Sequence, residues 1–415
     1  MKILFITGGA FAKSFGGYRS RALTSFEYVN RLAGGCALLA NEALFRVFAR
    51  GDRRRDLSRY AAASPAPVYG NWLLPERMPF GRAMDGRLVT RALRFVAQGE
   101  RPDILHIHSM FCPRIDARLK AALGVKLVFD YHGSAPEEAV MNGRCRRGDA
   151  RYAALKRMER RCALNADHLI CVSEAHRDEL RSELGPAAPP VTVVPCCADT
   201  RIFARDPEAR EETRRQHGLE GKFVAVYAGN FLAWNPAVET VRVLARIVRS
   251  FPDAHPLILS AKAYHPMIER ELVAMGLVAG SYTLADAPHD RMPGWLSAAD
   301  CGVLVRGESP VNRVAFPAKF SEYLACGLPV VTTAAVRDVA RIVGDEKLGV
   351  VLLDTSEESL EEGMEPLGSL RERMVREDLP GRCAVYARER LSWDSGAERY
   401  AEVYRGLVAG DPHVG

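Results

Sequence analysis

The sequence lacks a long apolar run, cysteine pairs of the metal-binding kind and a strong excess of one charge. No stretch of eighteen or more uncharged apolar residues occurs among its 415 residues, which argues against a membrane-spanning helix. The first residues, MKILFITGG, pass into polar sequence without a small-residue cleavage site, so we expect no secretion signal. These absences predict a cytoplasmic protein and leave the inner face of a membrane open as its place of work.

The ten cysteines are spread along the chain without a CxxC pair or a His-rich partner stretch. We therefore expect reduced thiols and no zinc site. The adjacent residues Cys196 and Cys197 have a redox interpretation, but neighbouring cysteines rarely bridge. A turn at the end of a strand is the simpler interpretation.

The formal charge is only +6, from 57 Lys and Arg against 51 Asp and Glu. This excess is too mild to indicate nucleic acid, and the chain has no aromatic stacking motif of the kind that binds it, so we expect no nucleic-acid partner. Arginines gather in the first half, at residues 53–55, 144–147 and 151–161. Such a basic face suits an anionic membrane or a phosphate-bearing acceptor.

Short apolar runs alternate with helical patterns along most of the chain. In the first part we predict strands at residues 2–7, 103–108, 126–132, 168–173 and 191–195. After a polar stretch, strands at 223–228, 257–261, 301–306 and 329–333 alternate with helices at 237–251, 267–275, 317–326 and 336–343. This alternation predicts the α/β class, with two parallel sheets covered on both faces and ligands at the carboxyl ends of the strands. Residues 35–99 give no clear pattern.

The segment at residues 306–333 carries the most informative chemistry. Pro317 suits the start of a helix, which puts Lys319 in the first turn, where free N–H groups and the helix dipole favour phosphate. Glu322, one turn further on the same face, could accept hydrogen bonds from ribose hydroxyls. Gly327 then ends the helix. The segment therefore predicts a site for a phosphate-bearing nucleotide.

This segment resembles the donor site of the retaining family-four glycosyltransferases of GT-B fold. Residues 322–330, EYLACGLPV, match the family stretch E-[AY]-[LM]-A-x-G-x-P-V. Further matches follow in family order: VSEAHRDEL (172–180), VVPCCADTRIF (193–203), VYAGNF (226–231), AADCGVLV (298–305) and a terminal SW-x(5)-RY-x(3)-Y (392–404). The resemblance covers about two thirds of the chain, and the ordered set is more specific than any single motif.

The resemblance implies two Rossmann-like domains with a cleft between them. We expect an acceptor domain at residues 1–200, a nucleotide-sugar donor domain at 201–390, and a terminal helix and tail at 391–415 that cross back to the first domain. It implies retaining transfer from a nucleotide diphosphate sugar to a glycan or lipid-linked acceptor, without a metal or other cofactor. Bacterial surface polysaccharide or glycolipid assembly is the usual setting of this branch.

The chain departs from the family pattern at two positions. The first Glu of the family pair falls at Val314, and the basic residue that commonly follows the glycine strand is missing after Gly229. Contact with the pyrophosphate then falls to Lys319, with Arg306, Asn312 and Arg313 behind it. Pro317, Gly229 and, from the first domain, Gly17 complete the expected donor-binding set. The structural alternative is that these residues only close a loop over solvent.

The first domain is expected to supply the acceptor side and the reacting neighbourhood. Gly16 and Gly17 follow the first strand, where a bare backbone can approach a phosphate or sugar, although an ordinary turn explains them equally. Arg19 and Arg21, just inside the next helix, either reach the cleft or face solvent. His132, which lies at a strand end beside a glycine, matches the family's histidine near the reacting sugar carbon, whereas most lone histidines are structural. Glu138 follows as an acceptor-side candidate.

Two rival functions remain at this point. A nucleotide-sugar 2-epimerase also binds a sugar diphosphate with two Rossmann domains. A non-catalytic binding protein could keep the fold after losing the chemistry, and the departures at Val314 and after Gly229 keep this second rival open.

Overall fold

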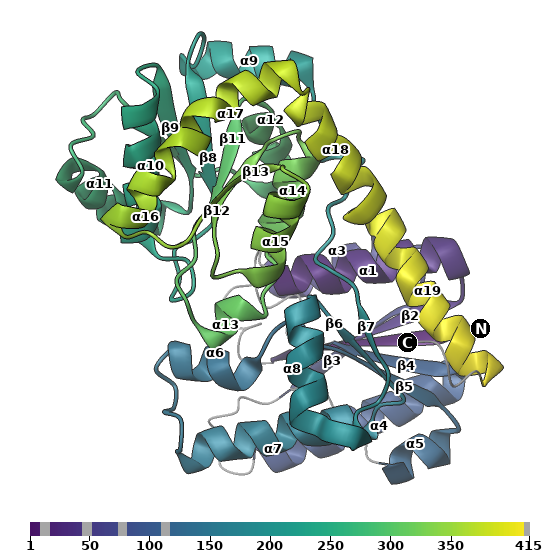
Figure 1. Cartoon of the computed structure of the whole chain (residues 1–415). Coiled ribbons are helices and arrows are strands. Elements are labelled where there is room, and N and C mark those ends of the chain that lie inside the picture. Colours follow the sequence, from purple (N-terminus) through teal and green to yellow (C-terminus); the bar gives the residue numbers. More distant parts are fainter. Residues whose placement is uncertain (9–16, 44–51, 74–80, 109–116, 411–415) are drawn as a thin grey trace. The chain divides into compact units, whose positions relative to one another are not determined.

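The computed structural model describes residues 1–8, 17–43, 52–73, 81–108 and 117–410 (Figure 1). The chain forms two compact units, Met1–Pro195 with Trp393–Gly415, and Cys196–Ser392. Each unit has a parallel sheet, so the predicted α/β class with two Rossmann-like domains is confirmed.

The first unit is built on a seven-stranded sheet in the order β3-β2-β1-β4-β5-β6-β7. Its strands are β1 (Ile3–Gly8), β2 (Cys36–Ala43), β3 (Val68–Leu73), β4 (Ile104–His108), β5 (Lys126–Asp130), β6 (His168–Cys171) and β7 (Val191–Val193). The strand order reverses between β1 and β4, and such a switch point is where open parallel sheets bind ligands. In the register of β4 and β5, His108 lies opposite Asp130 at the carboxyl ends.

The two faces of this sheet differ in chemistry. One face is aliphatic, with Leu105 and Ile107 of β4 packed in a core that α4 (Gly81–Glu100), α5 (Ala117–Leu123), α7 (Ala150–Asn165) and α8 (Glu174–Leu184) also join. On the other face Phe5 packs edge-on against Phe26 of α1 (Gly17–Ala33) and stacks on His106. Helix α19 (Trp393–Ala409) packs against α1, which confirms the predicted return of the terminal helix to the first unit.

The stretch at residues 35–99 gave no clear pattern, and its described part contains four elements. They are β2, α3 (Asp52–Ala63), β3 and α4. The positive φ angles of Gly34 (+64°) and Gly35 (+63°) follow the end of α1. The remaining described elements of the first unit are α6 (Ala135–Met141) and a short 3₁₀ turn at Gly185–Ala187.

The second unit is built on a six-stranded sheet in the order β10-β9-β8-β11-β12-β13. Its strands are β8 (Phe223–Ala228), β9 (Ala254–Leu259), β10 (Thr283–Ala285), β11 (Cys301–Leu304), β12 (Val330–Thr333) and β13 (Gly349–Leu352). The strand order reverses between β8 and β11, which sets the switch point of this sheet. Gly229 follows the first of these strands, and Arg306 lies two residues beyond the second.

Ten helices of the second unit surround this sheet. They are α9 (Pro207–His217), α10 (Ala237–Ser250), α11 (His265–Ala274), α12 (Met292–Ser297), α13 (Pro310–Arg313), α14 (Ala318–Ala325), α15 (Arg337–Asp345), α16 (Glu357–Glu362), α17 (Met364–Arg376) and α18 (Leu379–Arg390). The connections β8-α10-β9 and β11-α14-β12 run in opposite directions along the sheet. Because such crossovers are right-handed, they place α10 and α14 on opposite faces.

Helix α9 arises within a polar stretch to which the sequence assigned no element. Asp206 caps it by accepting from the Ala209 amide, and Arg210 and Arg214 reach Asp300 at 2.5 and 2.6 Å. Charge pairing, rather than an apolar face, therefore attaches this helix to its unit. A search for apolar periodicity does not detect such a helix.

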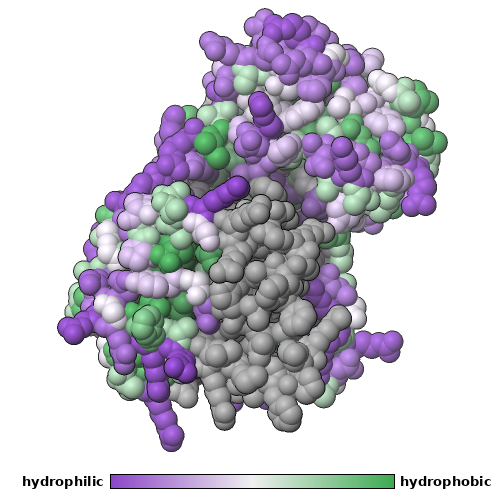
Figure 2. Space-filling view, turned by 180° about the vertical axis from the view of Figure 1, so that it is seen from behind, coloured by the Kyte–Doolittle hydropathy of each residue, from purple (hydrophilic) through white to green (hydrophobic). Residues whose placement is uncertain are grey.

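The described surface interleaves hydrophilic and hydrophobic residues (Figure 2). Some large apolar side chains are exposed singly, such as Phe95 at 73% and Val375 at 83%. Among the described residues, no helix combines the length and the apolarity needed to cross a membrane.

Candidate active site

Lys319 lies at the switch point of the second sheet. It is the second residue of α14, and Pro317 immediately precedes that helix as its N-cap. The Lys319 Nζ lies 4.2 Å from the centroid of the Tyr227 ring. A Cβ added at Gly229, whose φ is +135°, would lie 3.1 Å from the same Nζ. Helix α14 therefore places the ammonium group at the end of β8, where the positive φ of residue 229 and the close approach of Nζ favour glycine.

Lys319 and Glu322 are half-buried, and their surroundings shift both pKa values toward neutrality. Burial lowers the pKa of Lys319 to about 7, and the nearby Arg306 guanidinium lowers it further in the same sense. Burial raises the pKa of Glu322 to about 7, against the opposing effect of Lys319. Two cationic groups thus lie near a carboxyl group whose negative charge is disfavoured by burial. A bound anion would stabilise this arrangement.

Arg306, in the loop after β11, and Asn312, in α13, are hydrogen-bonded to one another. Both side chains are buried, and Arg306 Nη1 donates to Asn312 Oδ1 at 2.9 Å. Asn312 Nδ2 donates in turn to the Gly307 carbonyl at 2.8 Å, and its backbone N–H is capped by Ser309. Of the predicted donor-site residues, Lys319, Glu322, Arg306, Asn312, Pro317 and Gly229 lie in the second unit, whereas Gly17 belongs to the first.

Two other positions of this loop have structural explanations. Val314, which stands where the family has its first Glu, is fully buried as an apolar core residue. Arg313, ranked last by the sequence, pairs with Glu308 at 3.3 Å. Neither side chain adds charge to the Lys319 neighbourhood in this arrangement.

In the first unit, His132 lies two residues beyond β5. Its side chain is 16% exposed, and its Nε2 is 2.8 Å from His108 Nδ1. Gly133 has a φ of +149°, and a Cβ there would lie 3.1 Å from Glu138 Oε1. His132 and Glu138 therefore share the carboxyl end of β5.

The sequence analysis missed the groups beneath His132. Asp130 is fully buried and lies 3.0 Å from the guanidinium of Arg21, which is itself 2% exposed. The alternative that Arg21 faces solvent is therefore wrong. The pattern HIH at residues 106–108 held a usable signal, since alternate residues of a strand share a face and both histidines therefore point the same way.

The remaining candidates of the first unit, Gly16 and Arg19 on the acceptor side and Gly17 in the donor-binding set, are described only in part. Gly16 lies outside the described residues. Gly17 is the first residue of α1, and Arg19 follows in its first turn with a side chain outside the described part of the structure. Their roles stay predictions.

One group of described side chains, two histidines and an aspartate, consists of residue types that commonly bind metal ions. Atoms of His106, His108 and Asp130 lie within 4.8 Å of one another. The Arg21 guanidinium already donates a hydrogen bond to the Asp130 carboxylate. A metal ion at this place would therefore be repelled by a buried positive charge. We therefore assign these residues to a hydrogen-bonded network.

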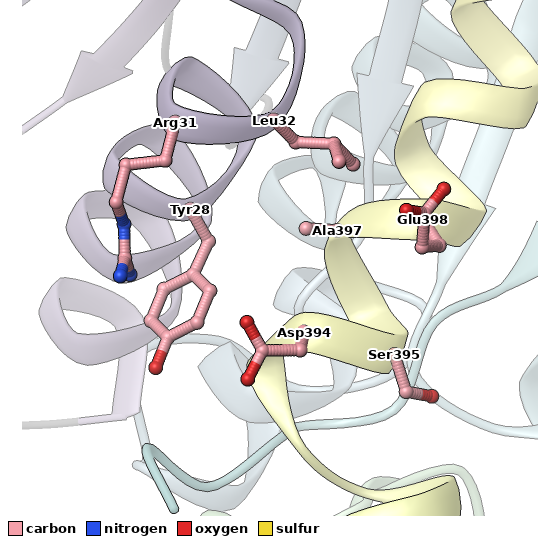
Figure 3. A pocket seen from close by; sticks show the side chains of 7 residues that line it. All are labelled: Tyr28, Arg31, Leu32, Asp394, Ser395, Ala397 and Glu398. Atoms are coloured by element: carbon pink, nitrogen blue, oxygen red, sulfur yellow. The ribbon is translucent and has the colours of Figure 1, made fainter. Parts of the chain in front are cut away.

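A separate pocket of about 420 Å³ lies between the second half of α1 and the first turns of α19 (Figure 3). It is lined by Tyr28, Arg31, Leu32, Asp394, Ser395, Ala397 and Glu398. The Arg31 guanidinium lies 3.9 Å from the centroid of the Tyr28 ring. At 1.5 Å per residue, Tyr28 is about 10 Å along α1 from Arg21, so the pocket is distinct from the His132 group.

Family models match most of the chain. Residues 37–202 match the model described as Glycosyltransferase Family 4, and residues 209–390 match the one described as Glycosyl transferases group 1. The chain is a family-four glycosyltransferase of GT-B fold. It therefore moves a sugar from a donor to an acceptor.

Curated relatives agree with this family at low identity. The glycosyltransferase is 25% identical over 250 residues to a GDP-mannose-dependent alpha-(1-6)-phosphatidylinositol monomannoside mannosyltransferase of Mycolicibacterium smegmatis, covering 60% of this chain and 64% of the relative. It is 26% identical over 325 residues to a D-inositol 3-phosphate glycosyltransferase of Thermomonospora curvata, covering 73% and 71% of the two chains. Among solved structures, Anabaena HepE in complex with UDP superposes with a TM-score of 0.72 at 16% identity, covering 98% of this chain and 100% of that one.

Proposed function

We propose that this glycosyltransferase takes its sugar from a nucleoside diphosphate donor, retains the anomeric configuration, and needs no metal or other cofactor. The observation that carries the proposal is the meeting of Lys319 and Arg306 with the amino-terminal end of α14, beside Gly229. Two cations, free helix N–H groups and a bare backbone suit a diphosphate. Glu322 is placed one turn further along the helix to accept from ribose hydroxyls.

The relatives support the class of donor without deciding the base. The structure of Anabaena HepE holds UDP, and the mannosyltransferase of M. smegmatis is named as dependent on GDP-mannose. Both ligands carry a diphosphate on a nucleoside.

In the proposed mechanism, charge on the departing diphosphate is stabilised by Lys319 and by the free N–H groups of α14. The donor's own phosphate helps to deprotonate the incoming acceptor hydroxyl, so no carboxylate nucleophile is required. His132 is the catalytic residue of the first unit, and it contacts the donor sugar. Glu138, with Gly16 and Arg19, forms the acceptor side, and Gly17 belongs to the donor-binding residues.

The acceptor is a glycan or a lipid-linked sugar, and the enzyme works in the cytoplasm at the face of an anionic membrane. Support comes from α7, on which Arg151, Arg157, Arg160 and Arg161 are exposed. Lys156, which the sequence placed on the same basic face, is instead held by Glu159 and Glu183 at 3.0 and 2.7 Å. The membrane-facing charge of α7 therefore consists of arginines alone.

A thermal-shift screen across UDP-, GDP-, ADP- and CDP-sugars tests this function. A nucleotide sugar at a hundred times its dissociation constant stabilises the protein by about 2.7 kcal/mol. The matching donor should also be hydrolysed slowly, with release of free sugar. Release of an epimer would favour the epimerase, binding without turnover would favour the non-catalytic protein, and no shift with any donor would contradict the proposal.

A further inference from the structure

The terminal motif RY-x(3)-Y lies on α19, at residues 399–404. Its tyrosines, Tyr400 and Tyr404, are fully buried on α19, which packs against α1 (Figure 1). Tyr400 Oη donates to Asp130 Oδ2 at 2.6 Å, and Tyr404 Oη contacts His106 Nδ1. The motif therefore reaches β5 and β4, the two strands whose ends carry the histidines of the site.

Asp130 is the charged centre of this network. Burial alone would raise its pKa, but Arg21 and the neighbouring histidines lower it, so that the pKa of Asp130 lies well below its usual range. Arg21 is fixed as well, because its Nη1 donates to the carbonyls of Val194 and Pro195 at 2.8 and 3.0 Å. Asp130 therefore stays ionised beneath His132, and its carboxylate accepts hydrogen bonds from the Arg21 guanidinium and the Tyr400 hydroxyl.

This carboxylate decides which nitrogen of His106 carries the proton. His106 Nε2 lies 3.4 Å from Asp130 Oδ2, so the negative charge favours the proton on Nε2. The lone pair of Nδ1 is then free to accept from the Tyr404 hydroxyl. The His106 ring, hydrogen-bonded at Nδ1 and facing the Asp130 charge at Nε2, stacks on the His108 ring with centroids 4.4 Å apart.

The stacked His108 reaches the catalytic residue directly. Burial and the adjacent His106 lower the pKa of His108 well below its ordinary value, so this ring is neutral. Its Nδ1 and the Nε2 of His132 are 2.8 Å apart, a hydrogen bond that needs one proton between them. Asp130 oxygens lie 3.6 Å from His108 Nδ1 and 3.9 Å from His132 Nε2. The negative charge of Asp130 therefore favours a proton between these two nitrogens. The orientation of the His132 ring follows from this arrangement.

We propose that Tyr400, Tyr404 and His108 are positioning residues for His132, and that α19 serves catalysis by holding the network beneath that ring. The proposal rests on the proposed function, in which His132 contacts the donor sugar. Its effect is on the fraction of molecules whose His132 ring is correctly oriented and protonated. Donor binding in the second unit does not depend on it.

Tyr400→Phe and Tyr404→Phe test the proposal, since each keeps the buried ring and removes only the hydroxyl. Each should lower kcat for turnover of the nucleotide sugar by about threefold to tenfold, the effect of one lost hydrogen bond, and leave the KM and the affinity for the nucleoside diphosphate within about twofold. The matched control is Tyr131→Phe, which removes another buried hydroxyl of the first unit, one that donates to the Glu159 carbonyl at 3.4 Å. This control should leave kcat unchanged.

A double-mutant cycle separates positioning from a general loss of stability. In a His132→Ala background, Tyr404→Phe should lower kcat no further, because the ring that it positions is gone. Nitrogen-15 spectra of the imidazoles give a readout without turnover: the His132 ring nitrogens should shift in Tyr404→Phe and stay in place in Tyr131→Phe.

The outcomes are distinguishable. If His132→Ala lowers kcat but the two α19 variants behave like Tyr131→Phe, or if the effects multiply in the double variant, the positioning proposal is overturned and the proposed function stands. If His132→Ala keeps the full kcat, the catalytic assignment of His132 is overturned and the positioning proposal falls with it.

Discussion

The two units differ in how one cation in each of them is paired. In the first unit, the Arg21 guanidinium lies 3.0 Å from the Asp130 carboxylate. In the second unit, none of the described carboxylates lies within 4 Å of the Lys319 Nζ. Both cations lie near the switch point of a parallel sheet. The Arg21 charge is balanced by Asp130, and the residues around this pair make up the network that we propose orients His132. The Lys319 ammonium lies near Arg306, which disfavours its charge, and near Glu322, which favours it. In the proposed function, a bound diphosphate completes this balance, so the first unit maintains a fixed orientation and the second is completed by its ligand.

The largest effect is expected when the internal charge balance of the first unit is broken. Asp130→Ala leaves the Arg21 guanidinium buried without its carboxylate, and it should lower the free energy of unfolding by about 3–5 kcal/mol. Chemical unfolding followed by circular dichroism measures this. Lys319→Ala is the control in the second unit and should change the free energy of unfolding by less than about 1 kcal/mol. Equal losses in the two variants would remove the distinction between the units.

His132→Ala should separate catalysis from binding. Turnover of the matching nucleotide sugar should fall by about 10²-fold, while nucleotide affinity and melting temperature stay nearly constant. The reason is that the ring lies at the partly exposed end of the network and acts in the transition state. A structural histidine would show the opposite result, a loss of about 1–3 kcal/mol of stability with full turnover per folded molecule.

Lys319→Ala should weaken binding of the nucleoside diphosphate by about 1–3 kcal/mol, the value of a charge-assisted hydrogen bond. Isothermal titration measures this with little interference from stability. Arg313→Ala is a matched control in the neighbouring loop, because that side chain pairs with Glu308. An unchanged affinity in Lys319→Ala would place the diphosphate elsewhere.

The smallest effect concerns the surface of the first unit. Removing the exposed charges of Arg157 and Arg161 should weaken binding to anionic vesicles by about 1 kcal/mol per residue at low salt. Vesicle sedimentation at two ionic strengths measures it, with Lys156→Gln as the control because Lys156 is held by Glu159 and Glu183. Equal binding to neutral vesicles would leave α7 as an ordinary solvated helix.

The sequence predicted most strands and the donor segment because both rest on local patterns. Apolar runs bounded by turn residues located β4, β5, β8 and β11, and a proline followed by Lys319 located the start of α14. Residues within four positions of one another carry this information, so it can be read without a structure.

The network beneath His132 could not be predicted in the same way. Asp130 meets Arg21 across 109 residues and Tyr400 across 270 residues, and no local pattern records such contacts. Helix α9 was missed for a related reason, since arginines attach it to Asp300 instead of an apolar face. Long-range polar contacts are thus what the sequence left out, and they surround the proposed catalytic residue.

The pH dependence of donor affinity tests most directly whether Lys319 is a charge kept for the ligand. Burial holds its pKa at about 7 in the free chain, and a bound diphosphate favours the ammonium form, so affinity should be highest below pH 7 and fall as the pH rises through 7. Glu322 gains its negative charge over the same range and acts in the same direction, while Arg306 stays charged. A nucleotide sugar is the right probe, because it lacks the terminal phosphate group that titrates near pH 6.

Titration of the matching nucleotide sugar between pH 6 and 9 should show affinity falling by up to about tenfold per pH unit above 7, with uptake of a proton on binding. Lys319→Arg, whose guanidinium stays charged throughout, should show a clearly weaker dependence. An affinity that is constant from pH 6 to 9 in the unaltered enzyme would contradict the account.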